Sequence, residues 1–308
     1  MSAGCLICLE ALTSGETYHD RCVKRLFGTS TVPRIEVEVA KLHTLAGVMV
    51  QHATLSGTQR KISLGFAQER ATLRVAGIGG IYILKPQTGV FPSLPENEHV
   101  TMRLGALFGL EIPPCGLVRL NDASLAFIIA RFDRAPDGRK VRQEDFCQLA
   151  QRPAKEKYRG LAERCAKIIQ RYSGQPGIDL LKLYRQLVCS WWVGNNDLHL
   201  KNLSLIAGED GRHRLSPAYD LVSTMLVILE DDRMALPMGG RERHLTRRGW
   251  LDFAASCGIP TRAADRVLAE PARLLARAES MAARSQLPAE MQTALITLLR
   301  ARAALLTA

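Results

Sequence analysis

The stretch GNNDLHLKN, residues 194–202, decides the fold and function classes predicted for this chain. It separates Asp197 from Asn202 by four residues, and another aspartate, Asp220, follows in the triplet AYD. Phosphoryl transfer needs one carboxylate that takes a proton from a hydroxyl group and oxygen ligands that hold Mg²⁺ against the phosphates. Asp197 is therefore a candidate catalytic base, and Asn202 and Asp220 are candidate Mg²⁺ ligands. The alternative is a polar turn, because Asn and Asp favour turns.

Two lysines earlier in the chain could contact the phosphates of a nucleotide. Lys61 follows the turn LSGTQR, in which Gly57 lets backbone amides approach phosphate oxygens. Lys85 ends the apolar run IYILK, and Glu98 on the next predicted helix could pair with it. Each feature alone is more typical of an ordinary turn, a snorkelling lysine or an exposed glutamate. Their order along the chain, ahead of the Asp/Asn loop, favours a nucleotide site.

Patterning of apolar residues divides the chain into a β-rich first part and an α-rich second part, which predicts an α+β fold. The runs KISLGF, ATLRVA, IYILK, CGLVRL and SLAFIIA predict one antiparallel sheet, with one helix from Pro95 to Gly109 among its strands. A helix is also predicted from Arg34 to Gly47. Further helices are predicted at residues 163–172, 178–193, 251–257, 262–284 with a break at Pro271, and 288–307. We predict an N-terminal lobe over residues 1–133, which comprises a short cysteine-containing segment, the glycine-bearing loop, the sheet and one helix, and an α-helical C-terminal lobe over residues 134–308.

Composition excludes several classes of protein. The chain has 308 residues, 47% hydrophobic and 23% charged, which is ordinary globular composition. No apolar run approaches the roughly 18 residues of a membrane span. The eight cysteines are too sparse for a disulfide scaffold and the start lacks signal-peptide character, so we expect a reduced, cytoplasmic protein without membrane contact. The net charge of +11 favours acidic partners, but no nucleic-acid module is recognisable.

The first residues contain a second candidate site. Cys5, Cys8, His19 and Cys22 form a C-x2-C pair, a ten-residue spacer and H-x2-C. Four soft ligands at this spacing could hold a structural Zn²⁺ tetrahedrally. The alternative is a segment with ordinary buried cysteines.

The chain resembles the HipA-like serine/threonine kinases, toxins of bacterial toxin–antitoxin systems, over nearly its whole length. The motifs that carry the resemblance are LSGTQRK, ILKP, PENEHVTM, ARFDR, QEDFCQ, GNNDLHLKN and PAYDLVS. It is most similar to the short HipT branch of the tripartite HipB, HipS and HipT systems, because the extra N-terminal subdomain of longer HipA proteins does not fit before Thr54. The resemblance implies the two-lobed protein-kinase-like fold, with a small β-rich N-lobe and a larger α-helical C-lobe.

The resemblance also implies an activity and the residues that perform it. The family members are ATP- and Mg²⁺-dependent protein kinases that phosphorylate an aminoacyl-tRNA synthetase, tryptophanyl-tRNA synthetase in the HipT branch, and so inhibit translation. Asp197 would be the base and Asn202 and Asp220 the Mg²⁺ ligands. The residues implied to contact ATP are Lys61, Lys85 and His199 near the phosphates, and Arg131, Phe132 and Asp133 on the adenine and ribose side.

Regulation and partners follow from the same resemblance. The family's glycine-rich loop is autophosphorylated at positions that here are Thr54 and Ser56, and a phosphate there would repel ATP. Implied partners are a HipB-like DNA-binding antitoxin and a HipS-like small protein, with DNA contacted only indirectly. Two alternatives remain open: a catalytically inactive scaffold of the same fold, and a zinc-stabilised nucleic-acid-binding protein.

Overall fold

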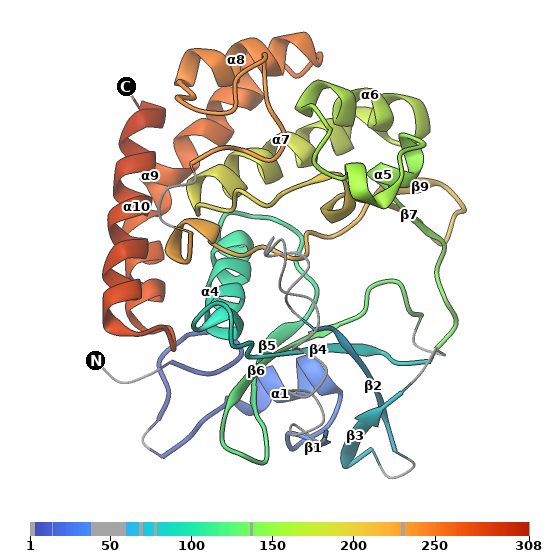
Figure 1. The fold of residues 1–308 in the computed structure, drawn as a ribbon, viewed down its shortest axis with the longest axis vertical. Helices are drawn as coiled ribbons and strands as arrows, with labels where there is room; N and C mark the ends of the chain where they lie inside the picture. The colour runs from blue at the N-terminus through green and yellow to red at the C-terminus, as the bar shows by residue number, and fades with distance from the viewer. Residues whose placement is uncertain are drawn as a thin grey trace. The chain divides into compact units, whose positions relative to one another are not determined.

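The computed structural model describes residues 4–13, 15–37, 60–67, 70–76, 79–135, 138–228 and 232–307. The chain forms two compact units (Figure 1). The first comprises Met1–Val100, Pro113–Lys140 and Arg284–Pro288, and the second comprises Thr101–Ile112, Val141–Ala283 and Ala289–Ala308. The division after residue 133 that the sequence suggests stays a prediction.

A six-stranded sheet forms the centre of the first unit, with strand order β1-β3-β2-β4-β6-β5. All neighbouring strands are antiparallel except β1 and β3, which are parallel. The predicted antiparallel strands are confirmed. Their bounds are β1 Arg34–Glu36, β2 Ile62–Phe66, β3 Thr72–Val75, β4 Tyr82–Pro86, β5 Cys115–Arg119 and β6 Leu125–Ala130.

The prediction of a helix beginning at Arg34 is wrong over the residues that the structure describes. Arg34–Glu36 is strand β1, and its three residues are paired with Thr72, Leu73 and Arg74 of β3. Burial alternates along β1, with Ile35 buried between two more exposed neighbours, as the two-residue period of a strand requires. The rest of the predicted helix, from residue 38 to Gly47, lies outside the described residues.

Helix α1, Asp20–Phe27, and the start of helix α4, Leu94–Leu107, belong to the first unit. Helix α1 buries Val23, Leu26 and Phe27 in the same hydrophobic cluster as the sheet residues Leu64 and Leu84. It ends at Gly28, whose φ of 69° is the left-handed conformation that glycine adopts readily at a helix end. Helix α4 has the predicted Pro95 in its first turn, where a missing amide hydrogen costs nothing.

The second unit is mainly helical and confirms the helices predicted for this part of the chain. Figure 1 shows α9 and α10 side by side, and this pair has the most extensive contact in the unit. Its helices are α5 Phe146–Leu149, α6 Ala162–Tyr172, α7 Pro176–Trp192, α8 Arg247–Ser256, α9 Thr261–Ala283 and α10 Ala289–Thr307. Among the described residues, no helix combines the length and apolar composition needed to span a bilayer.

The predicted break at Pro271 is wrong, because α9 continues through this residue to Ala283. A proline inside a helix removes one backbone hydrogen bond and costs about 3 kcal/mol. The buried residues Val267 and Leu268 precede Pro271, and Leu274 and Ala278 follow it, so apolar burial on both sides offsets that cost.

The second unit also contains a small antiparallel sheet, with strand order β7-β8-β9, that the sequence did not predict. Its strands are β7 Gln143–Asp145, β8 Ser204–Ala207 and β9 His213–Leu215. Three or four residues are too few to establish a two-residue period in a sequence. The sheet is tied to α7 by Asp179, whose carboxylate accepts a hydrogen bond from the backbone of Leu215 at 2.9 Å.

Candidate active site

The loop GNNDLHLKN connects the end of α7 to the start of β8 in the second unit. Its first residue, Gly194, donates a backbone hydrogen bond to Trp191 at 3.1 Å, and Asn195 donates one to Ser190 at 2.8 Å. The end of α7 is held in turn by the buried Arg302 of α10, whose guanidinium donates to the carbonyl of Trp191 and lies 4.9 Å from its ring. Burial lowers the pKa of Arg302 to about 10, which leaves it charged at neutral pH.

Gly194 has a backbone conformation and surroundings that no other residue type tolerates well. Its φ is 75°, and a Cβ atom there would lie 2.6 Å from Cδ2 of Leu298. We expect Gly194→Ala to lower the free energy of unfolding by about 1–2 kcal/mol, mostly from the left-handed backbone. Gly177→Ala in α7 is the matched control, since nothing lies within 4 Å of its Cβ position and alanine favours a helix. Urea unfolding of both variants checks the prediction, and equal midpoints would contradict it.

The side chains of Asp197 and Asn202 are fixed by hydrogen bonds within and around the loop. The amide nitrogen of Asn202 donates to the backbone carbonyl of Asp197 at 3.0 Å, and Asn202 is 5% exposed. That bond uses the nitrogen, so the amide oxygen is the atom that can bind a cation. The hydroxyl of Tyr158 donates to Oδ1 of Asp197 at 2.5 Å, and the Asp197 amide donates to Oδ1 of Asn195 at 3.1 Å.

Asp220 lies on a segment that is bound directly to the same loop. The hydroxyl of Tyr219 donates to the backbone carbonyl of Lys201 at 2.9 Å, so the residues that precede Asp220 and Asn202 are joined. Ser204 Oγ also bonds this hydroxyl, and burial raises the pKa of Tyr219. The φ of Asp220 is 55°, a conformation that aspartate adopts more readily than most residues and that recurs at functional sites. The three predicted residues are thus carried by adjoining segments.

His199 and Lys201 complete the loop. His199 is 1% exposed, and its ring lies 5.0 Å from the ring of Tyr158 in an edge-to-face arrangement. Lys201 donates to Oδ2 of Asp145 at 2.7 Å. The sequence missed both partners. Tyr158 belongs to no recognisable motif, and Asp145 lies in the quoted motif QEDFCQ without a role assigned to it, because each lies tens of residues from its partner.

A buried ion pair lies in the first unit. Nζ of Lys85, at the end of β4, donates to Oε1 of Glu98 on α4, which confirms the predicted pairing. Lys85 is 3% exposed and Glu98 is fully buried. The ammonium group also lies 5.6 Å from the ring of Phe127. A charge in this position is costly without a partner, so the pair holds both side chains in place.

Arg131 and Asp133 form a second, half-buried pair after β6. The guanidinium donates from Nε to Oδ1 at 2.9 Å and from Nη2 to Oδ2 at 2.6 Å. Burial alone would raise the pKa of Asp133, but the hydrogen bonds and charge of Arg131 together lower it. Phe132 between them is half-buried.

The structure describes some, but not all, of the other residues predicted to contact ATP, to be autophosphorylated or to bind zinc. Lys61 is exposed immediately before β2. Gly57, Thr54 and Ser56 lie outside the described residues. The four residues predicted to hold zinc are brought together in the first unit.

Comparison with known proteins places these features in a family. Residues 53–279 match the family described as HipA-like C-terminal domain. The chain is 32% identical over 225 residues to "Putative kinase Y4mE" of Sinorhizobium fredii, which covers 70% of this chain and 53% of that protein. It is 32% identical over 207 residues to a Haemophilus influenzae protein named "Putative kinase", covering 62% and 59%. The chain thus spans little more than half the length of these relatives.

Solved structures show the same fold. A chain from the complex of the Shewanella oneidensis MR-1 toxin–antitoxin system HipA, HipB and its operator DNA has a TM-score of 0.73 at 18% identity, covering 87% of this chain and 70% of that one. The Helicobacter pylori proinflammatory kinase CtkA has a TM-score of 0.55 at 14% identity, covering 80% and 90%. At identities this low, a structural match shows only the fold. The two matches confirm the predicted α+β, protein-kinase-like fold. With three quarters of its length matched by one family, the chain belongs to the HipA-like proteins.

Proposed function

We propose that this chain is an ATP-dependent protein kinase that transfers the γ-phosphoryl group to a serine or threonine hydroxyl. The observation that carries the proposal is the joint placement of Asp197, Asn202 and Asp220 on adjoining, mutually hydrogen-bonded segments. Family membership, the relatives named as kinases and the shared fold support it. A carboxylate and two oxygen ligands are what phosphoryl transfer requires of a protein.

The chemistry of the donor set fits a magnesium ion. Asn202 offers an amide oxygen and Asp220 a carboxylate, and Mg²⁺ prefers such hard oxygen ligands. Bound with ATP, the ion supplies positive charge that neutralises the phosphates. Asp197 then accepts the proton of the attacking hydroxyl, and Tyr158 orients its carboxylate through the bond to Oδ1.

In the first unit, Lys85 would bind the α- and β-phosphates of ATP, positioned by Glu98. The ion pair with Glu98 holds the Lys85 side chain in one orientation. Lys61, Gly57 and His199 would contact the phosphates as well. Arg131, Phe132 and Asp133 would line the adenine and ribose side, where the Arg131–Asp133 pair fixes the backbone after β6.

The biological role we propose is that of a toxin of the HipT type. Its substrate would be an aminoacyl-tRNA synthetase, tryptophanyl-tRNA synthetase in the first instance, so that phosphorylation inhibits translation. A HipB-like DNA-binding antitoxin and a HipS-like small protein would be its partners, with operator DNA contacted only through them. The fold likeness to HipA from a complex with HipB and DNA supports the antitoxin partner. Autophosphorylation of Thr54 or Ser56 would lower activity, because the added negative charge repels ATP.

A mass measurement tests this function. The full chain, ATP, Mg²⁺ and purified tryptophanyl-tRNA synthetase are incubated, and we expect the mass of one phosphoryl group on a serine or threonine of the synthetase. Peptide mapping of the same sample shows whether Thr54 or Ser56 is modified. Asp220→Ala should abolish both modifications, whereas Asp210→Ala, on an exposed turn of the same unit, should not.

The outcomes separate the alternatives. Transfer to another synthetase, and not to this one, would retain the kinase and reject the substrate. No transfer to any protein, with ATP and Mg²⁺ in excess, would favour an inactive scaffold of the kinase fold.

A further inference from the structure

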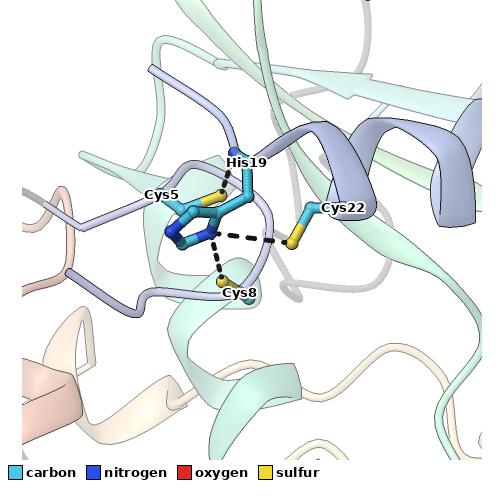
Figure 2. A group of neighbouring side chains, drawn as sticks. All are labelled: Cys5, Cys8, His19 and Cys22. Carbon is cyan, nitrogen blue, oxygen red and sulfur yellow. Dashed lines mark hydrogen bonds between the residues drawn. The ribbon is translucent and has the colours of Figure 1, made fainter. Parts of the chain in front are cut away.

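The first unit contains a cluster of three cysteines and one histidine that phosphoryl transfer does not use. Figure 2 shows the thiols of Cys5, Cys8 and Cys22 and the imidazole of His19 turned toward one another. Their ligand atoms all lie within 4.8 Å of one another. Nδ1 of His19 lies 3.3 Å from Sγ of Cys8 and 3.9 Å from Sγ of Cys22. Among the described residues, no other such group of potential metal ligands occurs.

These separations match those of a tetrahedral zinc site. Zn–S bonds of about 2.3 Å and Zn–N bonds of about 2.0 Å place neighbouring ligand atoms about 3.6–3.8 Å apart. The two distances from His19 lie on either side of this value. A disulfide does not explain the cluster, since none of the eight cysteines, all within the described residues, is in a disulfide.

The orientation of His19 is that of a metal ligand. Its Nε2 lies 3.0 Å from the backbone carbonyl of Ala11, and a carbonyl can only accept. Nε2 is therefore the nitrogen that donates to this carbonyl, and Nδ1 is the nitrogen that faces the sulfur atoms. Metal-binding histidines are held in this way by a second bond from the other ring nitrogen.

Backbone groups also lie close to two of the thiols. The His19 amide lies 3.5 Å from Sγ of Cys5 and donates toward it. Cys22 lies in the first turn of α1, where the helix dipole stabilises negative charge. Both arrangements place partial positive charge beside these two sulfur atoms, as suits ligands of a cation.

The loop that brings Cys5 and Cys8 together contains a strained backbone conformation. Leu9 has a φ of 62°, which is unfavourable for a leucine, and its amide bonds the carbonyl of Cys5 at 2.9 Å. Gly4 must be glycine, because a Cβ atom there would lie 2.6 Å from the carbonyl oxygen of Leu9. A bound cation would offset this strain.

We propose that Cys5, Cys8, His19 and Cys22 bind one structural Zn²⁺. Four protein ligands leave no open position for a substrate or an activated water, so the ion would stabilise the fold and would not catalyse. Cys5 and Cys22 are buried and Cys8 and His19 half-buried, which agrees with a closed site.

The ion would hold the loop onto two elements of the first unit. Leu117 of β5 donates a backbone bond to Leu6 at 2.7 Å, between the two cysteines of the loop. The fully buried His99 of α4 bonds the carbonyl of Ile7 at 3.1 Å, one residue along α4 from Glu98. The site therefore supports the helix that positions Lys85. In these contacts the backbone carbonyls of the loop accept hydrogen bonds from other residues of the same unit. The loop is thus packed against the protein itself, which favours a structural role over nucleic-acid binding.

Metal analysis of the purified full chain tests the proposal. We expect about one zinc per chain that survives dialysis against a weak chelator. Cys8→Ser and Cys22→Ser should lose it, and Cys257→Ala, which removes a buried thiol outside the cluster, should keep it. His19→Cys preserves a four-ligand set and should also retain zinc, whereas His19→Ala should bind it more weakly.

A second measurement covers the case in which the serine variants do not fold. The wild-type chain, stripped of metal and titrated with Co²⁺, should show the absorption of a tetrahedral, thiolate-bound cobalt ion and saturate at about one equivalent. Stripping should also lower the Tm and expose Cys5, Cys8 and Cys22 to alkylation. Octahedral cobalt without thiolate bands, or zinc content unchanged in both serine variants, would overturn the proposal. Failure of phosphoryl transfer would not bear on it, because the metal readouts are independent of activity.

Discussion

Asp197→Asn is expected to lower the rate of phosphoryl transfer by about 10²–10⁴-fold, the usual contribution of a general base. Asparagine has nearly the same shape, and its amide oxygen can still accept the hydrogen bond that Tyr158 donates to Oδ1 of Asp197. It cannot take a proton. The affinity for ATP should therefore change little while the rate falls, and single-turnover kinetics together with calorimetric ATP titration would measure the two effects separately.

Two variants serve as comparisons for Asp197→Asn. Tyr158→Phe removes only the hydroxyl that orients the carboxylate, and it should reduce the rate less than the loss of the base does. Asp210→Asn changes an aspartate on the exposed turn between β8 and β9 and should leave the rate unchanged. If Asp197→Asn transferred phosphate at the wild-type rate, Asp197 would not be the catalytic base, even in a protein with a kinase fold.

The sequence predicts well those structural features that depend on residues close to one another in the chain. The four residues proposed to bind zinc lie within 18 residues of one another in the chain, and the structure brings their side chains together. The strands of the sheet and the long amphipathic helices follow from periodicity, and the Asp/Asn loop follows from one local motif. In each case the physical cause lies within a short window of sequence.

The features that sequence reasoning missed depend on partners far along the chain. Strand β1 has three residues, too few for the sequence alone to reveal a two-residue period, and its pairing with β3 defines it as a strand. Helix α9 tolerates Pro271 because of the apolar residues that it buries. Tyr158 contacts Asp197, and Arg302 contacts Trp191, through tertiary contacts within the second unit. Tertiary contacts of this kind outweigh local propensity, and no local pattern records them.

The second large effect is expected at the Lys85–Glu98 pair. Lys85→Met leaves the carboxylate of Glu98 buried without this cation, and Glu98→Gln leaves the ammonium group of Lys85 without this anion. Removing one partner of a buried ion pair costs about 3–5 kcal/mol, because the remaining charge loses its compensation. The pair joins β4 to the start of α4, so the loss should concentrate in these two elements.

Hydrogen exchange of the β4 and α4 amides, followed with increasing denaturant, measures that loss locally, which matters because a chain of two units need not unfold in one step. The exposed pair Glu36–Arg74 of the same sheet is the matched control, and Glu36→Gln should change exchange very little. The double variant Lys85→Met with Glu98→Met should recover most of the lost protection, because it removes both charges of the pair together. It should nevertheless bind ATP as poorly as Lys85→Met does, since both variants lack the Lys85 ammonium group that would contact the α- and β-phosphates. Recovery of protection without recovery of ATP binding would separate the structural effect of the pair from its effect on the nucleotide. A double variant as unstable as either single variant would show instead that shape and hydrogen bonding at this position, and not compensation of charge, hold β4 to α4.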